Sequence, residues 1–218
     1  MKRLVIFDLD GTLLNTLADL ATAANAALHA CGFERRSIQE VQRFVGNGVE
    51  KLLLRALPEN QKTPENLARM KHAFFTYYDA HLWEFTRPYP GMVALLEKLQ
   101  AQDVKLAVAS NKYQRATERL VAHFFPTCSF SAVLGQREGV PTKPHPHMVQ
   151  EILTQAHVSP AEAWYVGDSE VDMQTAAHAG VQACGVLWGF RTEEDLLAFR
   201  PACLVRTVAE LEHQLITL

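Results

Sequence analysis

Short apolar segments alternate with segments of helical period along most of this chain, and this alternation limits its fold more than any other feature. The apolar segments are partly β-branched and bounded by turn residues, so they are typical of buried strands. They cover residues 3–7, 104–109, 131–134, 163–166 and 181–187, and the helical segments cover residues 92–102, 113–124, 148–156 and 171–179. Strands that alternate with helices form parallel sheets covered on both faces. The sequence therefore predicts an α/β fold with a doubly wound parallel sheet.

Residues 15–86 interrupt this alternation, because they contain no convincing strand. Ala- and Leu-rich segments, a capping box and a threonine followed by proline indicate helices instead. The expected helices cover residues 17–31, begin at the capping box of Ser37 and Glu40, follow the Gly46-Asn47-Gly48 turn as far as Ala56, and run from Thr63-Pro64 to about Trp83. We therefore expect an α/β core of residues 1–14 and 87–218 that carries an inserted all-helical domain, residues 15–86.

Composition and charge exclude several classes of protein. Hydrophobic residues make up 48% of the 218 residues and charged residues 21%, which is typical of a globular chain and not of a disordered one. The formal net charge is −3, whereas domains that bind nucleic acids are usually basic. We therefore expect no nucleic-acid partner.

Targeting signals and cysteine usage indicate the compartment. The apolar run of residues 4–7 is too short for a signal peptide, and no window of about 18 apolar residues could span a membrane. The four cysteines form no C-x-x-C pair, so we expect free thiols in a reducing environment. The sequence thus predicts a cytoplasmic protein with no membrane partner, and it carries no signal of an oligomeric state.

Two aspartates directly follow the first predicted strand. Asp8 and Asp10 are two residues apart, so their side chains face the same way in extended backbone. They lie at the carboxyl end of a strand, where open α/β sheets bind ligands. Neighbouring carboxylates repel one another unless a cation or a proton relieves them. A solvated acidic turn is the alternative, but the D-x-D-G-T pattern favours a functional site.

A second acidic cluster follows the strand of residues 163–166. Asp168 is at the strand end, and Asp172, one helical turn further on, can face the same site. Ser169 is placed to cap the next helix. Acidic clusters at two strand ends form a plausible site for a hard cation, and oxygen ligands suit Mg²⁺.

Two further segments could bind an anion. Ser110 and Asn111 follow the strand of residues 104–109, where a hydroxyl and backbone N–H groups at the start of a helix would form an anion cradle. An ordinary helix cap is the alternative. Lys143 lies in a proline-stiffened turn and could place a positive charge against a phosphate, although a single lysine is more often a surface charge.

These four elements occur in chain order, each at a strand end or just before a helix. In this arrangement the chain resembles the haloacid-dehalogenase superfamily of phosphatases, whose motifs are matched by Asp8-x-Asp10-Gly-Thr, Ser110, Lys143 and Gly-Asp168-Ser-x-x-Asp172. The resemblance covers essentially the whole chain. It implies a Rossmann-like core, with the inserted helices as a type 1 cap.

The resemblance also implies a role for each motif residue. Asp8 would be the nucleophile that forms an aspartyl-phosphate, and Asp10 would protonate the leaving group and then activate water. Mg²⁺ would be held by the Asp8 side chain, the Asp10 carbonyl and Asp168, with Asp172 orienting waters or Lys143 from outside the ligand set. The phosphate-binding residues would be Ser110, Asn111 and Lys143.

Within that superfamily the sequence is most similar to the phosphoglycolate phosphatase branch. Residues 14–20, 24–28 and 185–190 carry this similarity, and Gly46, Asn47 and Gly48 would form a cap loop that shapes specificity. The resemblance implies a Mg²⁺-dependent phosphoric monoester hydrolase whose partner is a small phosphorylated metabolite, in the first place 2-phosphoglycolate. Asn15 stands where many members carry aspartate. Candidate ligands for a substrate carboxylate are Arg43, Lys51 and Arg55, although such residues are more often solvated.

Several alternatives stay open at this point. Pyrophosphate, a sugar phosphate or a nucleotide could be the substrate, and an isomerase similar to β-phosphoglucomutase would use the same residues. A dehalogenase is disfavoured, because a halide leaving group needs no acid such as Asp10. A phospho-acceptor domain of the response-regulator type is disfavoured by the D-x-D spacing and the helical insertion. A zinc site at His145 and His147 is disfavoured because no further ligands lie near them in sequence.

Overall fold

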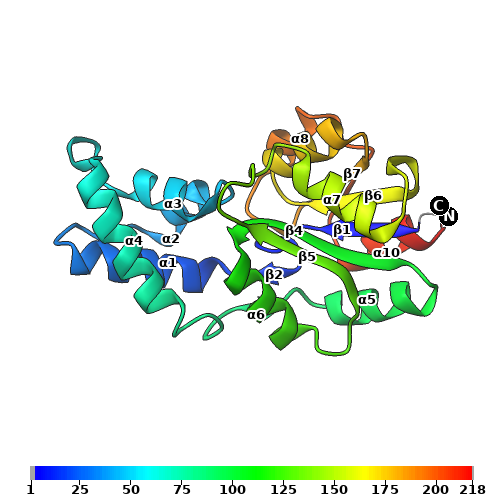
Figure 1. Cartoon of the computed structure of the whole chain (residues 1–218), viewed down its shortest axis with the longest axis horizontal. Helices are drawn as coiled ribbons and strands as arrows, with labels where there is room; N and C mark the ends of the chain where they lie inside the picture. The colour runs from blue at the N-terminus through cyan, green and yellow to red at the C-terminus, as the bar shows by residue number, and fades with distance from the viewer. Residues whose placement is uncertain (1–2, 218) are drawn as a thin grey trace. The chain divides into compact units, whose positions relative to one another are not determined.

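The computed structural model of the chain describes residues 3–217, and six of the strands in this range form one sheet (Figure 1). The order across the sheet is β5-β4-β1-β6-β7-β8, and each neighbouring pair runs parallel. The strands are β1 (Leu4–Phe7), β4 (Lys105–Tyr113), β5 (Phe130–Gln136), β6 (Ala163–Gly167), β7 (Gln182–Val186) and β8 (Cys203–Val205). The predicted parallel α/β sheet is confirmed.

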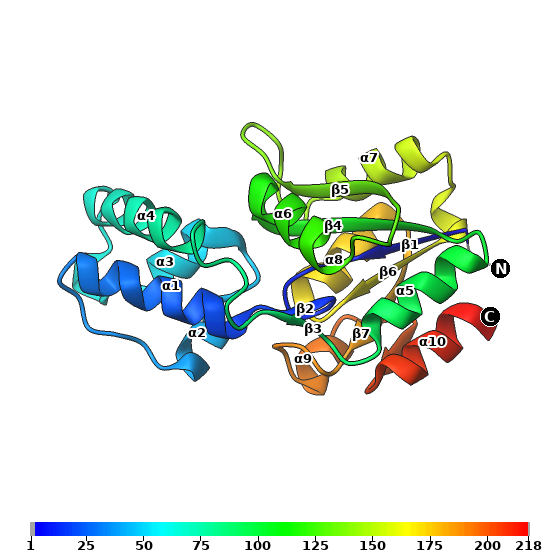
Figure 2. The ribbon, with the colours of Figure 1, turned by 90° about the horizontal axis from the view of Figure 1, so that it is seen from below.

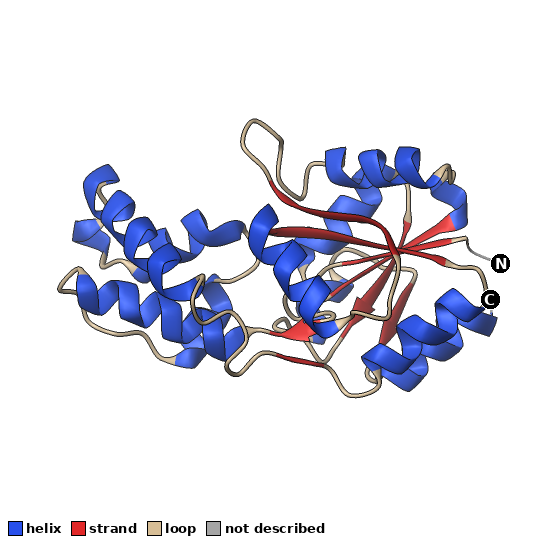
Figure 3. Cartoon of the chain, turned by 60° about the horizontal axis from the view of Figure 1, so that its bottom comes forward, coloured by secondary structure: helices blue, strands red, loops and turns tan. Residues whose placement is uncertain are grey.

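Helices cover both faces of this sheet (Figures 2 and 3). The helices are α5 (Met92–Ala101), α6 (Gln114–Phe124), α7 (His147–Ala156), the 3₁₀ helix η2 (Pro160–Glu162), α8 (Glu170–Ala179), α9 (Glu193–Leu197) and α10 (Val208–Thr217). Helices α7 and α8 lie on one face, and α5 and α10 lie on the other. Leu4 and Ile6 share a buried cluster with residues of α7 and α8, because alternate side chains of a strand point to the same face.

The topology brings the ends of three strands to one edge of the sheet. Strand β1 pairs with β4 on one side and with β6 on the other, so that Phe7 is level with Val108 and Val166. The Asp8 N–H donates a hydrogen bond to the Val166 carbonyl at 2.9 Å. Asp8 and Asp168, which follow these strands directly, are therefore neighbours although they are far apart in sequence.

Strand β4 is longer than predicted. The sequence predicts a strand that ends at residue 109, with Ser110 at the start of a helix. The strand instead continues to Tyr113, which pairs with Gln136 of β5 after a shift in register, and α6 begins only at Gln114. The expected helix N-terminus at Ser110 and Asn111 was wrong, because both residues lie within β4, in the irregular stretch between its pairs with β5 at Ala109 and Tyr113.

The elements after β7 were not anticipated. Strand β8 has three residues and α9 has five, which is too short for a periodic pattern to be recognised. A local signal was available for α9, since Thr192 and Asp195 form a capping box at its start.

Residues 16–87 form a second compact unit, separate from the α/β unit that the described residues on either side make up. These boundaries lie one residue beyond the expected ones. Its helices are α1 (Leu17–Ala30), α2 (Ile38–Phe44), α3 (Gly48–Ala56), the 3₁₀ helix η1 (Glu59–Gln61) and α4 (Pro64–Tyr78). The chain enters and leaves this unit through two short paired strands, β2 (Leu14–Asn15) and β3 (Arg87–Pro88).

Local signals account for the starts of these helices. Ser37 and Glu40 form the predicted capping box of α2, and Thr63 caps α4 with proline at the first helical position. Helix α4 ends about five residues earlier than expected, because tighter i→i−3 hydrogen bonds to the Tyr77 and Tyr78 carbonyls replace the α-helical pattern. Within residues 3–217, no helix combines the length and apolar character that a membrane span requires.

Candidate active site

Three buried aspartates converge at the edge of the sheet where β1 and β6 end. Asp8 follows β1, Asp168 follows β6, and Asp172 lies in the first turn of α8. One carboxylate oxygen from each lies within 4.8 Å of the others. Their exposed fractions are 7%, 2% and 0%, so water does little to screen the repulsion between them.

Lys143 supplies a positive charge to this group. Its Nζ lies 2.9 Å from Asp8 Oδ1 and 2.7 Å from Asp172 Oδ1, and it donates a hydrogen bond to the Tyr165 hydroxyl at 3.0 Å. The Asn111 amide holds the backbone at the same position: its Nδ2 donates to the Lys143 carbonyl at 3.1 Å, and its Oδ1 accepts from the Lys143 N–H at 2.9 Å. Asn111 therefore positions Lys143 from the neighbouring strand.

Asp168 is held by donors from two distant loops. The Thr12 hydroxyl donates to Oδ1 at 3.2 Å, and the Phe190 N–H donates to Oδ2 at 2.7 Å. Gly11 and Gly189 pack so closely against this side chain that a Cβ atom at either position would collide with it. The carboxylate is thus fixed in one place.

Asp172 is already engaged by protein donors. Its Oδ2 accepts from the Ser169 N–H at 3.1 Å and from the Ser169 hydroxyl at 2.6 Å, which completes the predicted cap of α8. Its Oδ1 accepts from Lys143 and, at 3.1 Å, from the Tyr165 hydroxyl. Asp172 therefore orients Lys143, with little capacity left for another ligand.

Asp10 lies at the border of this group and pairs with a different lysine. Lys112 Nζ is 3.1 Å from each of the two Asp10 carboxylate oxygens. Ser110, two residues before Lys112 on β4, is 1% exposed, and its hydroxyl accepts a hydrogen bond from the Lys112 N–H at 3.2 Å. Ser110 thus lies at the same edge of the sheet as the aspartates.

Burial and mutual repulsion shift the ionisation of the cluster. Burial, followed by the charge of Asp172, raises the pKa of Asp8 to about 7, although Lys143 opposes the shift. Burial also raises the pKa of Asp168 well above its usual range, together with the charges of Asp172 and Asp8. Burial alone would lower the pKa of Lys143, but the same two carboxylates outweigh it and raise that pKa.

The donor set fits a hard divalent cation. Four carboxylates face two ammonium groups here, namely Asp8, Asp10, Asp168 and Asp172 against Lys112 and Lys143. When all are ionised, two negative charges stay uncompensated in a largely buried space. Oxygen ligands and this charge suit Mg²⁺ better than a soft metal.

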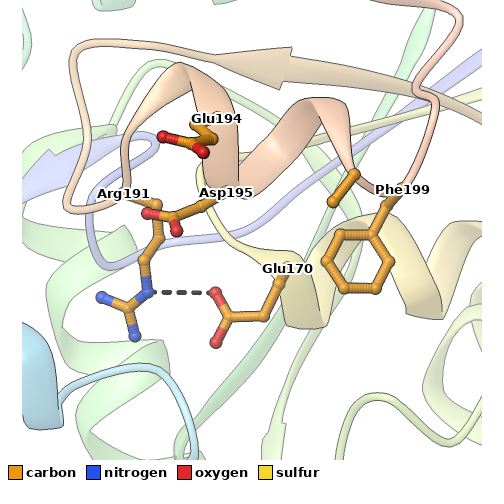
Figure 4. Close-up of a pocket in the computed structure, with 6 residues that line it drawn as sticks. Glu170, Arg191, Glu194, Asp195 and Phe199 are labelled. Carbon is orange, nitrogen blue, oxygen red and sulfur yellow. Dashed lines mark hydrogen bonds and ion pairs between the residues drawn. The ribbon is translucent and has the colours of Figure 1, made fainter.

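A separate pocket of about 360 Å³ lies beside α8 and α9, and Figure 4 shows its lining. Its walls are Glu170, Arg191, Glu194, Asp195, Ala198 and Phe199. Arg191 Nε is paired with Glu170 Oε2 at 3.0 Å, so the acidic groups dominate and would repel a phosphate. None of the predicted site residues lines this pocket.

The predicted cap residues lie in the helical unit. Gly46 and Gly48 both have positive φ angles, 118° and 81°, which glycine adopts without strain, and Asn47 between them precedes α3. Arg43, Lys51 and Arg55 are exposed, and Arg55 donates to the Phe44 carbonyl at 2.8 Å. His145 and His147 belong to no metal-binding group among the residues that the structure describes.

Four residues that contribute to the site were given no role from the sequence. These are Thr12, Lys112, Tyr165 and Phe190, which contact Asp168, Asp10, Lys143 and Asp168 respectively. Alternation along β6 could have indicated Tyr165, since a polar hydroxyl on the face of a buried strand needs a partner. No local pattern points to Phe190, because it acts through its backbone.

Comparisons with known proteins identify the family and the fold of the chain. A family model described as haloacid dehalogenase-like hydrolase matches residues 5–186. The phosphoglycolate phosphatase of Pseudomonas putida is 32% identical over 208 residues, which are 94% of this chain and 76% of that protein. The phosphoglycolate phosphatase of Mannheimia succiniciproducens is 32% identical over 215 residues, 96% of each chain. A crystal structure of a predicted phosphoglycolate phosphatase from Haemophilus somnus superimposes with a TM-score of 0.91 at 30% identity, covering 100% of this chain and 98% of that one.

Proposed function

Because the chain belongs to the haloacid dehalogenase-like hydrolases and is a phosphoric monoester hydrolase, we propose that it hydrolyses 2-phosphoglycolate with Mg²⁺ through a phosphorylated Asp8. The observation that carries this proposal is the contact of Lys143 Nζ with Asp8 Oδ1 at 2.9 Å inside a cluster of buried carboxylates. A cation beside a nucleophilic carboxylate is what an incoming phosphate dianion requires. The choice of 2-phosphoglycolate rests on the names of the relatives, which are phosphoglycolate phosphatases.

Asp8, Asp168 and the Asp10 carbonyl would hold the cation. The Asp8 and Asp168 oxygens lie within the same 4.8 Å group, whereas both oxygens of Asp172 are taken by protein donors. When bound, Mg²⁺ would neutralise the carboxylates and the phosphoryl oxygens.

The reaction would proceed in two displacements at phosphorus. An Asp8 oxygen forms a bond to phosphorus while the bond to the ester oxygen breaks, and protonated Asp10 gives its proton to the departing glycolate oxygen. Asp10 then takes a proton from water, whose oxygen attacks the phosphorylated Asp8 and releases inorganic phosphate. Asp10 is thereby protonated again at the end of the cycle, as it was at the start.

Lys143 and Ser110 would position the phosphoryl group. Lys143 is fixed by Asp172, Tyr165 and the Asn111 amide, so its ammonium does not need to be ordered when the substrate binds. Preorganised charge of this kind supplies much of the stabilisation that phosphoryl transfer requires.

The test is phosphate release from a panel of esters with Mg²⁺ and with EDTA. The panel contains 2-phosphoglycolate, pyrophosphate, sugar phosphates and nucleotides. We expect 2-phosphoglycolate to have the highest kcat/KM, and EDTA to abolish release until Mg²⁺ is restored. A higher kcat/KM for another ester would overturn the substrate, and undiminished release in EDTA would overturn the metal.

The Asp8→Asn variant tests the nucleophile. We expect a loss of about 10⁴-fold or more, because the asparagine amide cannot attack phosphorus. Asp103→Asn is the matched control, since Asp103 is exposed in a turn with φ of 59°, a conformation that asparagine tolerates. Full activity of Asp8→Asn would exclude the proposed intermediate.

A further inference from the structure

Lys112 is a buried cation to which the mechanism above gives no task. Its side chain is 2% exposed, and its Nζ lies 3.1 Å from both oxygens of Asp10. It follows Ser110 and Asn111 on β4, so the strand fixes the position of its backbone. Lys143 contacts Asp8 and Asp172, whereas Lys112 contacts Asp10. The two lysines therefore serve different parts of the site.

The position of Asp10 indicates where the leaving group lies. An acid that protonates the ester oxygen has to come within hydrogen-bond distance of it. In 2-phosphoglycolate a single methylene group separates that oxygen from the carboxylate. The substrate carboxylate therefore comes close to any group that contacts Asp10, and the Lys112 ammonium is such a group.

We propose that Lys112 is a specificity-determining residue, which binds the carboxylate of the leaving group. This inference rests on the proposed function, both for the substrate and for the acid. Lys112 exchanges one carboxylate partner, Asp10, for another, the substrate. Its ammonium is already buried in the free protein, so the exchange adds no further desolvation penalty for the lysine itself.

The location of this cation explains how the α/β unit alone can recognise an acidic leaving group. The candidates in the helical unit, Arg43, Lys51 and Arg55, are exposed, and solvent weakens the discrimination that an exposed charge provides. A buried ammonium on a rigid strand interacts more strongly with a carboxylate than with a neutral group. We therefore place the selectivity for the acid in β4.

The experiment compares three substrates in Lys112→Met. They are 2-phosphoglycolate, its neutral amide 2-phosphoglycolamide, and p-nitrophenyl phosphate, whose leaving group needs little protonation. We expect kcat/KM for 2-phosphoglycolate to fall about 100-fold, because one partner of a buried charge pair is removed. The amide should lose about threefold or less, so the preference of the wild type for acid over amide disappears. Lys112→Arg, which keeps the charge, should retain part of that preference.

Other patterns of loss would overturn the inference. An equal loss on the acid and the amide, with p-nitrophenyl phosphate unaffected, would mean that Lys112 acts only through Asp10. An equal loss on all three would indicate phosphoryl binding or damage to the fold. A wild type that hydrolyses acid and amide equally well would show that the carboxylate is not recognised. If the wild type prefers another ester in the panel above, the proposed function fails whatever the Lys112 variants do.

Binding supplies a readout that does not depend on turnover. In an Asp8→Asn background, calorimetry should show that Lys112→Met weakens the binding of 2-phosphoglycolate about 100-fold and leaves inorganic phosphate unchanged. Equal weakening of both ligands would contradict the inference. Lys105→Met is the matched control, because Lys105 begins the same strand and donates to the Ala156 carbonyl at 2.6 Å, away from the site. Thermal unfolding of each variant verifies that it is folded.

Discussion

The two compact units each bury a carboxylate, but in opposite ways. In the helical unit Asp19 is 2% exposed and accepts hydrogen bonds from three neutral donors: the Phe85 N–H at 3.0 Å, the Thr86 N–H at 2.8 Å and the Thr86 hydroxyl at 2.6 Å. In the α/β unit Asp8 and Asp168 are buried too, yet their surroundings contain further carboxylates. In the first arrangement hydrogen bonds stabilise the carboxylate, and in the second neighbouring carboxylates repel it.

This difference separates a structural carboxylate from a functional one. Asp19 ties the first turn of α1 to the end of the same unit, and its environment asks for no ligand. The cluster around Asp8 is stable only with protons, lysines or a cation, so it is prepared for a reaction at the expense of stability. Burial of an acidic residue is therefore a weak sign of function until its partners are known.

Removing Lys143 should have the largest effect on stability. In Lys143→Met the carboxylates of Asp8 and Asp172 lose their shared cation, and we expect the free energy of unfolding to fall by about 3–5 kcal/mol. Phosphate release should fall about 10³-fold. Denaturant titration and ester hydrolysis measure the two effects. The double variant with Asp8→Asn should regain part of the stability, and no recovery would show that Lys143 acts by packing alone.

The pH dependence of stability should show the same repulsion. The pKa of Asp8 is about 7 in the folded metal-free protein and near 3.8 when exposed, so between pH 4 and pH 7 the folded state binds more protons than the unfolded state. The contribution of Asp8 is thus fully present below pH 4 and is lost as the pH rises through 7, with a magnitude of up to about 4 kcal/mol. Urea titrations across this range measure it. Asp8→Asn should have a flatter profile, and an unchanged slope would contradict the assignment.

Asp19, unlike Asp8, should stabilise the fold through its carboxylate, so its removal should destabilise the protein. In Asp19→Ala the Phe85 N–H and the two buried donors of Thr86 lose their acceptor, so we expect the free energy of unfolding to fall by about 2–3 kcal/mol. Asp19→Asn keeps one carbonyl oxygen and should lose less. Thermal and denaturant unfolding provide the measurement. If Asp19→Ala were as stable as the wild type, the distinction between the two kinds of carboxylate would fail.

The smallest effect should come from an exposed helix cap. Ser37→Ala removes the hydroxyl that accepts from the Glu40 N–H at 3.2 Å, and we expect a loss of about 1 kcal/mol in the free energy of unfolding with kcat unchanged. Ser159 is a matched control, since its capping box opens a 3₁₀ helix of only three residues. Ser159→Ala should therefore lower the free energy of unfolding less than Ser37→Ala does. The reverse order would contradict the assignment of the effect to helix capping.

The sequence predicted the site residues that directly follow a strand, because the end of a strand can be recognised from the local pattern. Asp8 and Asp168 follow apolar runs directly, and parallel pairing then brings them together. The pairing of Lys112 with Asp10 could not be predicted in this way. It depends on the continuation of β4 beyond Ala109, which pairing with β5 decides and no local pattern indicates.

The close packing of Gly11 and Gly189 against Asp168 affects which sequence motif can identify related chains. A short signature built around the aspartates describes only the groups that react. The choice of residue is equally restricted at Gly189, because any larger residue there would occupy the space of the Asp168 carboxylate. A useful signature for this architecture therefore includes positions whose contribution is the absence of a side chain.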